Sequence, residues 1–355
     1  MNENAPFFSN KLISWYLENK RELPWRGTKD PYFIWLSEIM LQQTRVAQGM
    51  PYYFKFTETF PTVFDLAAAS EAEVLKLWQG LGYYSRARNL HTTAKYIAYE
   101  LNGRFPSTYK DLVALKGVGD YTASAIASIC FSLPHAVVDG NVYRVLARVF
   151  GITTPINVSK GIKDFKVLAQ KLLEESNPGT YNQAIMEFGA RFCVPQNPEC
   201  SRCIFKDECV AYNNGSVKEI PVKLKKVKVK KRFFNYLVFL SPDNTTQLIQ
   251  RTQKGIWQQL YEFPLVETEK EVSLDVLKKE TGFKTLVAGI QLQSVVLYKE
   301  DSVIHKLSHQ HLYTRFWIVS VSEVKKNRVP ISEIRDYPVP VLIQNFISEF
   351  SAFTN

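Results

Sequence analysis

The sequence predicts two domains of different fold class, an all-α domain followed by an α+β domain. The chain has 355 residues, more than one hydrophobic core commonly organises. From residue 7 to about 212 the apolar residues recur at helical spacing, whereas residues after 232 form short β-branched and aromatic runs. Residues 216–232 are strongly basic and contain a proline, as exposed linkers do. We therefore expect domains at 1–215 and 233–355, joined by a linker at 216–232.

The individual elements follow from periodicity and from turns rich in Gly, Pro and Asp. Helices are predicted at residues 13–20, 33–46, 71–82, 121–132, 141–151 and 162–176. In the second half, strands are predicted at 235–240, 246–252, 294–299 and 311–321, with helices near 271–281 and 339–350.

Composition favours a polyanionic partner. The net charge is +10, which attracts nucleic acid through counterion release and steering; the alternative is a protein that merely repels itself. The linker likewise either contacts phosphates or is a solvated tether. No run of 18 apolar residues occurs, and the opening MNENAPFF lacks the basic and apolar regions of an export signal. We expect a cytoplasmic, nucleoid-associated protein with no membrane contact.

Four cysteines form a cluster with the spacing C-x6-C-x2-C-x5-C, at Cys193, Cys200, Cys203 and Cys209. A disulfide framework is disfavoured because only five cysteines are spread through this long chain. Four thiolates in one short segment suit either a structural Zn²⁺ or a [4Fe–4S] cluster. Because zinc sites commonly use two close cysteine pairs and this segment has one, the spacing favours the iron–sulfur cluster without excluding zinc.

Two carboxylates are candidates for acid and charge-stabilising roles. Glu38 lies in the apolar run PYFIWLSEIML, where burial would raise its pKa toward that of a general acid. Alternatively, Glu38, Gln42 and Arg45 form the solvated stripe of an amphipathic helix. Asp139 precedes a predicted helix and is expected to cap it. A cap that faces a cleft could also stabilise positive charge on a sugar.

Other residues suit nucleic acid. Gly117 and Gly119 predict a tight turn between helices, whose N–H groups could bind a phosphate, although an ordinary helical corner also needs glycine. Gln43, Tyr83 and Tyr84 lie among amides and arginines that could hold unpaired bases. Alternatively, one of the two tyrosines belongs to an aromatic turn packed into the interhelical core.

Jointly, several motifs resemble the helix-hairpin-helix base-excision glycosylases, and more narrowly the adenine DNA glycosylases of the MutY family. They are LPWR at 23–26, SEIMLQQTRV at 37–46, GLGYYSRARNL at 80–90, LKGVGDYTA at 115–123, VVDGNVYRVLARV at 137–149 and the cysteine cluster. The resemblance covers nearly all of residues 7–212. It implies a [4Fe–4S] cluster on the four cysteines, since the family uses this spacing for it.

The resemblance implies roles for matching positions. Glu38 would protonate the flipped adenine at N7, and Asp139 would stabilise the oxocarbenium ion or its covalent successor. Asn141 and Tyr121 would organise the acid, the water and the sugar.

Further positions match DNA contacts of the family. Arg26 and Gln183 would touch the adenine, while Gln43 and Tyr83 would wedge into the base stack beside the opposing base. Gly117 and Gly119 would approach the DNA backbone. The hairpin carbonyls of Val113, Leu115 and Val118 would hold a monovalent cation or calcium there.

One departure bears on the reaction. Bifunctional relatives such as endonuclease III carry a Schiff-base lysine, and the candidate positions here hold Ser124 and Tyr143. We therefore expect a monofunctional glycosylase that leaves an abasic site.

The C-terminal half resembles the Nudix-like domain with which this family inspects 8-oxoguanine. Its landmarks are KGIWQQLYEFP at 254–264 and LSHQHL at 307–312, in which Ser308 and His309 would sense the lesion. Leu307 departs from the phenylalanine usual there. DVLKKETGF retains only a remnant of the Nudix metal-binding helix, so pyrophosphatase activity is not expected.

The expected function is removal of adenine mispaired with 8-oxoguanine, and less selectively with guanine, from double-stranded DNA by a monomeric enzyme. Two alternatives stay open. One is an endonuclease III-like glycosylase and lyase acting on oxidised pyrimidines, and the other is a non-catalytic iron–sulfur protein that binds DNA.

Overall fold

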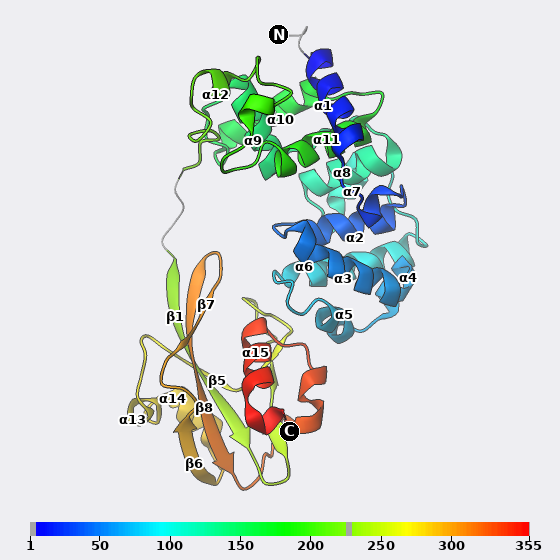
Figure 1. Cartoon of the computed structure of the whole chain (residues 1–355). Coiled ribbons are helices and arrows are strands. Elements are labelled where there is room, and N and C mark those ends of the chain that lie inside the picture. The colour runs from blue at the N-terminus through cyan, green and yellow to red at the C-terminus, as the bar shows by residue number, and fades with distance from the viewer. Residues whose placement is uncertain (1–4, 225–228, 355) are drawn as a thin grey trace. The chain divides into compact units, whose positions relative to one another are not determined.

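The computed structural model describes residues 5–224 and 229–354 (Figure 1). It divides into two compact units, one of residues 1–68 and 89–225 and the other of residues 69–88 and 226–355. The segment 69–88, which carries α5 (Glu71–Leu77), thus groups with the C-terminal half rather than with the predicted N-terminal domain. Residues 225–228 of the predicted linker lie outside the described residues, as do residues 1–4, so the boundaries at 215 and 232 stay predictions.

The first unit is helical, which confirms the predicted fold class. Its helices are α1 (Ala5–Asn19), α2 (Pro31–Leu41), α3 (Val46–Thr59), α4 (Val63–Ala68), α6 (Ser85–Lys95, which begins in the other unit), α7 (Tyr109–Ala114), α8 (Asp120–Phe131), α9 (Gly140–Phe150), α10 (Ser159–Leu172), α11 (Pro178–Arg191) and α12 (Val210–Asn213).

Helix α2 runs through the interior of this unit. Asp30 caps it by accepting from the Tyr32 N–H at 2.8 Å, and Pro31 takes the first helical position, where no N–H is needed. Every residue from Ile34 to Met40 is buried, as expected for a helix that is apolar nearly all round. The helix ends at Leu41, five residues before the predicted end, and Gln43 turns away with a φ of 55°.

Helices α7 and α8 form the predicted hairpin. Thr108 caps α7 by accepting from the Asp111 N–H at 3.2 Å. Gly117 then turns the chain with a φ of +82°, and a Cβ built on it would lie 2.7 Å from the Asn89 Cβ. Glycine is therefore required at 117 both for its backbone conformation and for the close approach of α6.

Helix α9 begins at a side-chain cap and ends at Gly151, whose φ of 65° is the left-handed conformation that terminates helices. It packs against α11 and α12, while α11 also packs against α1 and α8. These contacts bring the start of α9 and one face of α11 beside α2 and α8.

The second unit is built on a five-stranded sheet of order β5-β1-β8-β6, with β7 also paired to β8. Strands β1 and β8 are parallel, with Tyr236 opposite Phe316, and the other pairings in this sheet are antiparallel. The elements are β1 (Lys230–Leu240), β2 (Thr245–Gln247), β3 (Ile249–Gln250), β4 (Tyr261–Glu262), β5 (Leu265–Thr268), β6 (Leu292–Leu297), β7 (Val303–Lys306), β8 (Gln310–Val321), β9 (Arg328–Pro330), α13 (Leu274–Leu277), α14 (Thr281–Val287) and α15 (Val341–Glu349).

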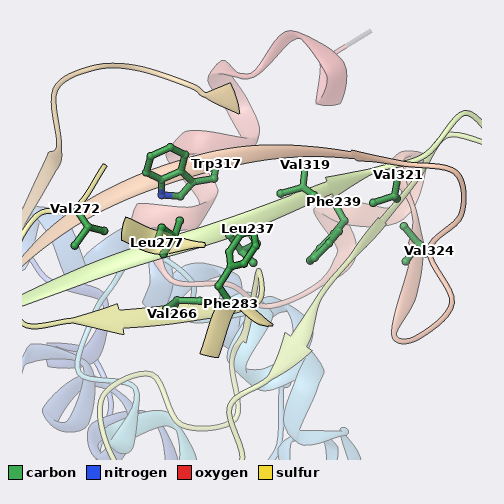
Figure 2. Packing of buried hydrophobic residues seen from close by; sticks show 10 residues of the cluster. All are labelled: Leu237, Phe239, Val266, Val272, Leu277, Phe283, Trp317, Val319, Val321 and Val324. Carbon is green, nitrogen blue, oxygen red and sulfur yellow. The ribbon is translucent and has the colours of Figure 1, made fainter. Parts of the chain in front are cut away.

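One hydrophobic core fastens the short helices to this sheet. Figure 2 shows Leu237 and Phe239 of β1 with Trp317 of β8 among side chains from α13 and α14, including Leu277 and Phe283. The α+β class and the helix near 339–350 are confirmed. The single helix predicted at 271–281 is wrong, because the extended Glu280 separates α13 from α14.

Among the described residues, no helix combines the length and the apolar character needed to cross a membrane.

Candidate active site

Glu38 is a buried acid. Its side chain lies on α2 among apolar neighbours, and the residue is only 9% exposed. Burial raises its pKa to about 7, and the Asp139 carboxylate adds to this, while a hydrogen bond from Tyr121 and the charge of Arg26 oppose it. The solvated-stripe alternative is wrong, because Glu38 is buried and Arg45 lies beyond the end of the helix. A carboxyl group with this pKa can donate a proton near neutrality.

Asp139 is fixed at the start of α9. One carboxylate oxygen accepts from the N–H groups of Asn141 and Val142 at 2.9 and 2.8 Å, and the other accepts from the Asn141 side-chain amide at 2.8 Å. Burial raises the pKa of Asp139, and these hydrogen bonds and the nearby Arg144 oppose that rise. The predicted helix cap is therefore present, and Asn141 orients the Asp139 carboxylate through both its backbone N–H and its side-chain amide.

A single cavity joins six of the predicted residues. It has a volume of about 170 Å³ and lies between α2, α8, the start of α9 and α11. The predicted residues on its wall are Arg26, Glu38, Tyr121, Asp139, Asn141 and Gln183. The Tyr121 hydroxyl also lies 3.1 Å from the Met186 Sδ, on the α11 side of the cavity. Of the described residues that line this cavity, none is a lysine, and Ser124 is buried elsewhere on α8.

The sequence interpretation missed an ion-pair network on the same wall. Glu187 accepts from Arg21 at 2.7 and 2.6 Å and from Arg26 at 2.8 Å. Burial would raise the pKa of Glu187, but the two guanidinium groups outweigh it and lower that pKa to about 2. Arg26 also lies over the Tyr16 ring, whose hydroxyl donates to Gln183 at 2.5 Å. Glu187 follows Gln183 by one helical turn, so their shared face of α11 was the available signal.

The four cysteines line one small cavity beside α9 and α11. Phe205 N–H donates to Cys203 Sγ at 3.4 Å, and Arg148 lies 3.5 Å from Cys193 Sγ. Both contacts favour a thiolate, although burial outweighs the first of them and raises the pKa of Cys203. The donor set therefore fits a metal centre that prefers sulfur. Within residues 5–224 and 229–354, however, no three His, Cys, Asp or Glu side chains are gathered closely enough to hold a metal ion as they stand.

Helix α9 connects the cysteine segment to the cavity that holds Glu38 and Asp139. Arg144 donates to the Cys193 carbonyl at 2.7 Å, to the Gly189 carbonyl at 2.6 Å and to the Asn141 side-chain oxygen at 2.9 Å. One turn later, Arg148 donates to the Val194 carbonyl at 2.8 Å. Arg144 thus contacts both Asn141, which orients Asp139, and the first residue of the cysteine segment.

The hairpin residues do not line the cavity that holds Glu38 and Asp139; Gly117 and Gly119 are exposed, whereas the side chains of Leu115 and Val118 are buried. Gly119 precedes α8, and a Cβ built on it would meet no atom within 4 Å, so the space beside it is open. The Leu115 carbonyl accepts from the Val118 N–H at 3.1 Å, and Thr93 Oγ1 donates to the Lys116 carbonyl at 2.8 Å. The turn is therefore ordered before any ligand arrives.

The residues predicted to contact the opposing base occupy two places. Gln43 is exposed just after α2 in the first unit. In the second unit, Tyr83, Ser308 and His309 line one cavity of about 520 Å³. Tyr83 is 46% exposed with a φ of 51°, and the Ser308 hydroxyl lies 3.3 Å from His309 Nδ1. Trp257 also lines this cavity and was not singled out from sequence.

Comparison with known proteins identifies both halves. Residues 36–171 match the HhH-GPD superfamily base excision DNA repair proteins, and residues 235–349 match the NUDIX domain. An adenine DNA glycosylase of Buchnera aphidicola subsp. Baizongia pistaciae is 35% identical over 318 residues, 88% of this chain and 86% of that protein. The human adenine DNA glycosylase is 46% identical over 213 residues, 58% of this chain and 39% of that protein.

Two solved structures are similar to about three fifths of this chain. A thermostable thymine-DNA glycosylase is similar with a TM-score of 0.56 and 29% identity, over 60% of this chain and 98% of that one. An endonuclease III in a non-covalent DNA complex, at 20% identity and a TM-score of 0.53 over 61% of this chain and 98% of that one, shares the fold. The chain belongs to the adenine DNA glycosylases, hydrolases that act on N-glycosyl bonds in DNA.

Proposed function

We propose that this enzyme excises adenine opposite 8-oxoguanine, and less selectively opposite guanine, without cutting the strand. The observation that carries the proposal is the pairing of Glu38, whose pKa is about 7, with the fixed carboxylate of Asp139 in one cavity. Enzymes that cleave glycosidic bonds commonly use two carboxyl groups whose surroundings set different pKa values, so that one donates a proton and the other stays ionised.

In the proposed reaction, Glu38 donates its proton to N7 of the flipped adenine, which makes the base a better leaving group. Asp139, held by the N–H groups at the start of α9, then stabilises positive charge on the sugar. Asn141 and Tyr121 keep the two carboxyl groups, the water and the sugar in register.

Adenine would enter a pocket whose charges are already paired. Arg26 and Gln183 contact the base, and Glu187 fixes the Arg26 guanidinium before the base arrives. Because these groups are ordered without substrate, little reorganisation accompanies binding.

The monofunctional outcome rests on nucleophile chemistry. A lyase needs an amine that forms a Schiff base with the sugar, and no lysine lines the described part of the catalytic cavity. Water is therefore the nucleophile, and the product is an abasic site.

Recognition of the opposing base is assigned to residues outside this cavity. Gln43 and Tyr83 would wedge beside that base, and Ser308 and His309 would sense 8-oxoguanine. Support comes from the shared cavity of Tyr83, Ser308 and His309 and from the exposure of Gln43. Removing an undamaged base requires that selectivity come from its partner, which is the task proposed for the Nudix-like half.

Cys193, Cys200, Cys203 and Cys209 would hold a [4Fe–4S] cluster. A bound cluster would supply a rigid link between the ends of this segment, and no step of excision passes through it. Gly117 and Gly119 would contact the DNA backbone, with a monovalent cation or calcium at the carbonyls of the hairpin. The net charge of +10 favours binding to nucleoid DNA. We expect the protein to act as a monomer.

The test is single-turnover cleavage of three duplexes, each analysed with and without alkali. They carry adenine opposite 8-oxoguanine, adenine opposite guanine, and thymine glycol opposite adenine. We expect strand breaks only after alkali, only in the adenine duplexes, and fastest opposite 8-oxoguanine. Glu38→Gln should abolish them while DNA binding persists, which also excludes a non-catalytic role. Nicking of the thymine glycol duplex without alkali would instead favour an endonuclease III-like lyase.

A further inference from the structure

An acidic side chain lies beside the hairpin that is proposed to contact DNA. Asp120 is the first residue of α8 and directly follows Gly119. N–H groups at this end of a helix attract phosphate, whereas a carboxylate beside them repels it. The space at Gly119 is open to an approaching ligand. A proposed phosphate site with a negative charge next to it requires a compensating cation.

Lys166 of α10 supplies that cation. Its Nζ lies 2.6 Å from Asp120 Oδ1, although the two residues are 46 positions apart in sequence. The Tyr109 hydroxyl donates to the same carboxylate oxygen. The Tyr109 ring stacks on His135 with centroids 4.4 Å apart, and the Lys166 ammonium lies 5.9 Å from the Tyr109 ring centre. These contacts fix the direction in which the lysine side chain extends.

The Lys166 ammonium retains capacity for a further partner. It has three N–H donors, and its hydrogen bonds to Asp120 and Tyr109 use two of them. The side chain is 52% exposed, which leaves the third donor for a ligand that approaches from solvent. The hydrogen bond to Asp120 raises the pKa of Lys166 and partial burial opposes this, so the amine stays charged at neutral pH.

We propose that Lys166 donates to a DNA phosphate at the hairpin and that Asp120 positions its ammonium for this contact. The pair cancels the repulsion from the carboxylate, and the phosphate accepts from both the hairpin N–H groups and the lysine. The inference rests on the proposed DNA contact of the hairpin and adds to it a residue from α10, outside the hairpin motif.

The salt dependence of binding tests the contact. Each phosphate neutralised by a cation contributes about 0.9 to the slope of log affinity against log salt. We expect Lys166→Ala to lower this slope by about 0.9 on an undamaged duplex, so that its affinity changes about 3.5-fold less between 50 and 200 mM salt. Lys166→Arg should retain the wild-type slope. Lys160→Ala is the matched control, because Lys160 also lies on α10 and pairs with a carboxylate, Asp164, at 2.5 Å.

Repeating the substitution in Asp120→Asn protein distinguishes a direct contact between Lys166 and phosphate from neutralisation of the Asp120 carboxylate. In Asp120→Asn protein there is no carboxylate to cancel, so a lysine that served only that purpose would have no further effect. We expect Lys166→Ala to lower the slope there as well. An unchanged slope in this background, or an equal effect of Lys160→Ala, would overturn the proposal. Thermal unfolding of each variant checks that it is folded.

Failure of this inference is distinguishable from failure of the proposed function. Binding to an undamaged duplex requires no excision, and excision is measured separately on the adenine duplexes. Unchanged slopes together with intact excision would remove only the role of Lys166, whereas absent excision in the wild-type protein would remove the proposed function.

Discussion

Replacing Glu38 by glutamine should stabilise the folded protein at alkaline pH while it abolishes excision. The carboxyl group is buried, and its pKa of about 7 lies above the ordinary value of 4.5. Because the folded state binds this proton more tightly than the unfolded state, the free energy of unfolding falls as pH rises from 4.5 through 7. The difference amounts to about 3 kcal/mol of stability lost above pH 7. Glutamine, which is neutral and nearly the same shape, does not incur this loss.

The assay is thermal unfolding of wild type and Glu38→Gln at pH 4 and pH 8. At pH 4 both side chains are neutral and the two proteins should unfold together. At pH 8 the variant should have the higher Tm, by about 6–12 °C for a cooperative unit of this size. Glu58→Gln, a change at an exposed position of α3, serves as the control. An increase in Tm that is equal at the two pH values, or no larger than that of the control, would refute the assignment of Glu38 as a buried carboxyl group with a raised pKa.

Three further outcomes are expected. The single-turnover excision rate should fall about tenfold per pH unit above pH 7 as Glu38 ionises. Tyr121→Phe should shift this fall in rate to higher pH, because it removes a hydrogen bond that lowers the Glu38 pKa. An excision rate that stays constant from pH 7 to 9 would contradict this. Cys203→Ala should lose bound iron and DNA affinity, measured by metal analysis and titration, whereas Cys130→Ala should keep both; iron retained in Cys203→Ala would argue against the cluster. His309→Ala should bring the rate opposite 8-oxoguanine down to the rate opposite guanine, and equal losses on both duplexes would exclude a selective role.

Sequence patterns singled out several residues that line the candidate site, but not their surroundings. Glu38 was recognisable because a carboxylate inside an apolar helix is unusual, and Asp139 because it stands where caps occur. The pattern could not distinguish burial from a solvated stripe, since that depends on where α2 ends and on what α8 covers. The shared face of Gln183 and Glu187 could have pointed to Glu187, but its pairing with Arg21 could not be predicted, because the two residues lie 166 positions apart and meet only through the packing of α11.

The second half shows the same limit. Runs of β-branched and aromatic residues predicted the segments that contain β1, β2, β3, β6 and β8, but not β4, β5, β7 or β9. The helix predicted near 339–350 is present as α15. Within the helix predicted at 271–281 only α13 forms, and the extended backbone at Glu280 separates it from α14, which begins at the end of the predicted segment. The pairing of Lys166 with Asp120 could not be predicted either, since it depends on how α10 lies against α8.

Gly189 illustrates how a position can matter to chemistry without touching substrate. A Cβ built on this residue of α11 would lie 2.7 Å from the Asn141 Cβ and 3.0 Å from the Asn141 carbonyl oxygen. Even alanine would push α9 away and tilt the amide that orients Asp139. By residue type, Gly189→Ala is a conservative change within a helix. We nevertheless expect it to lower the excision rate in the same direction as loss of the Asn141 amide, which donates to Asp139.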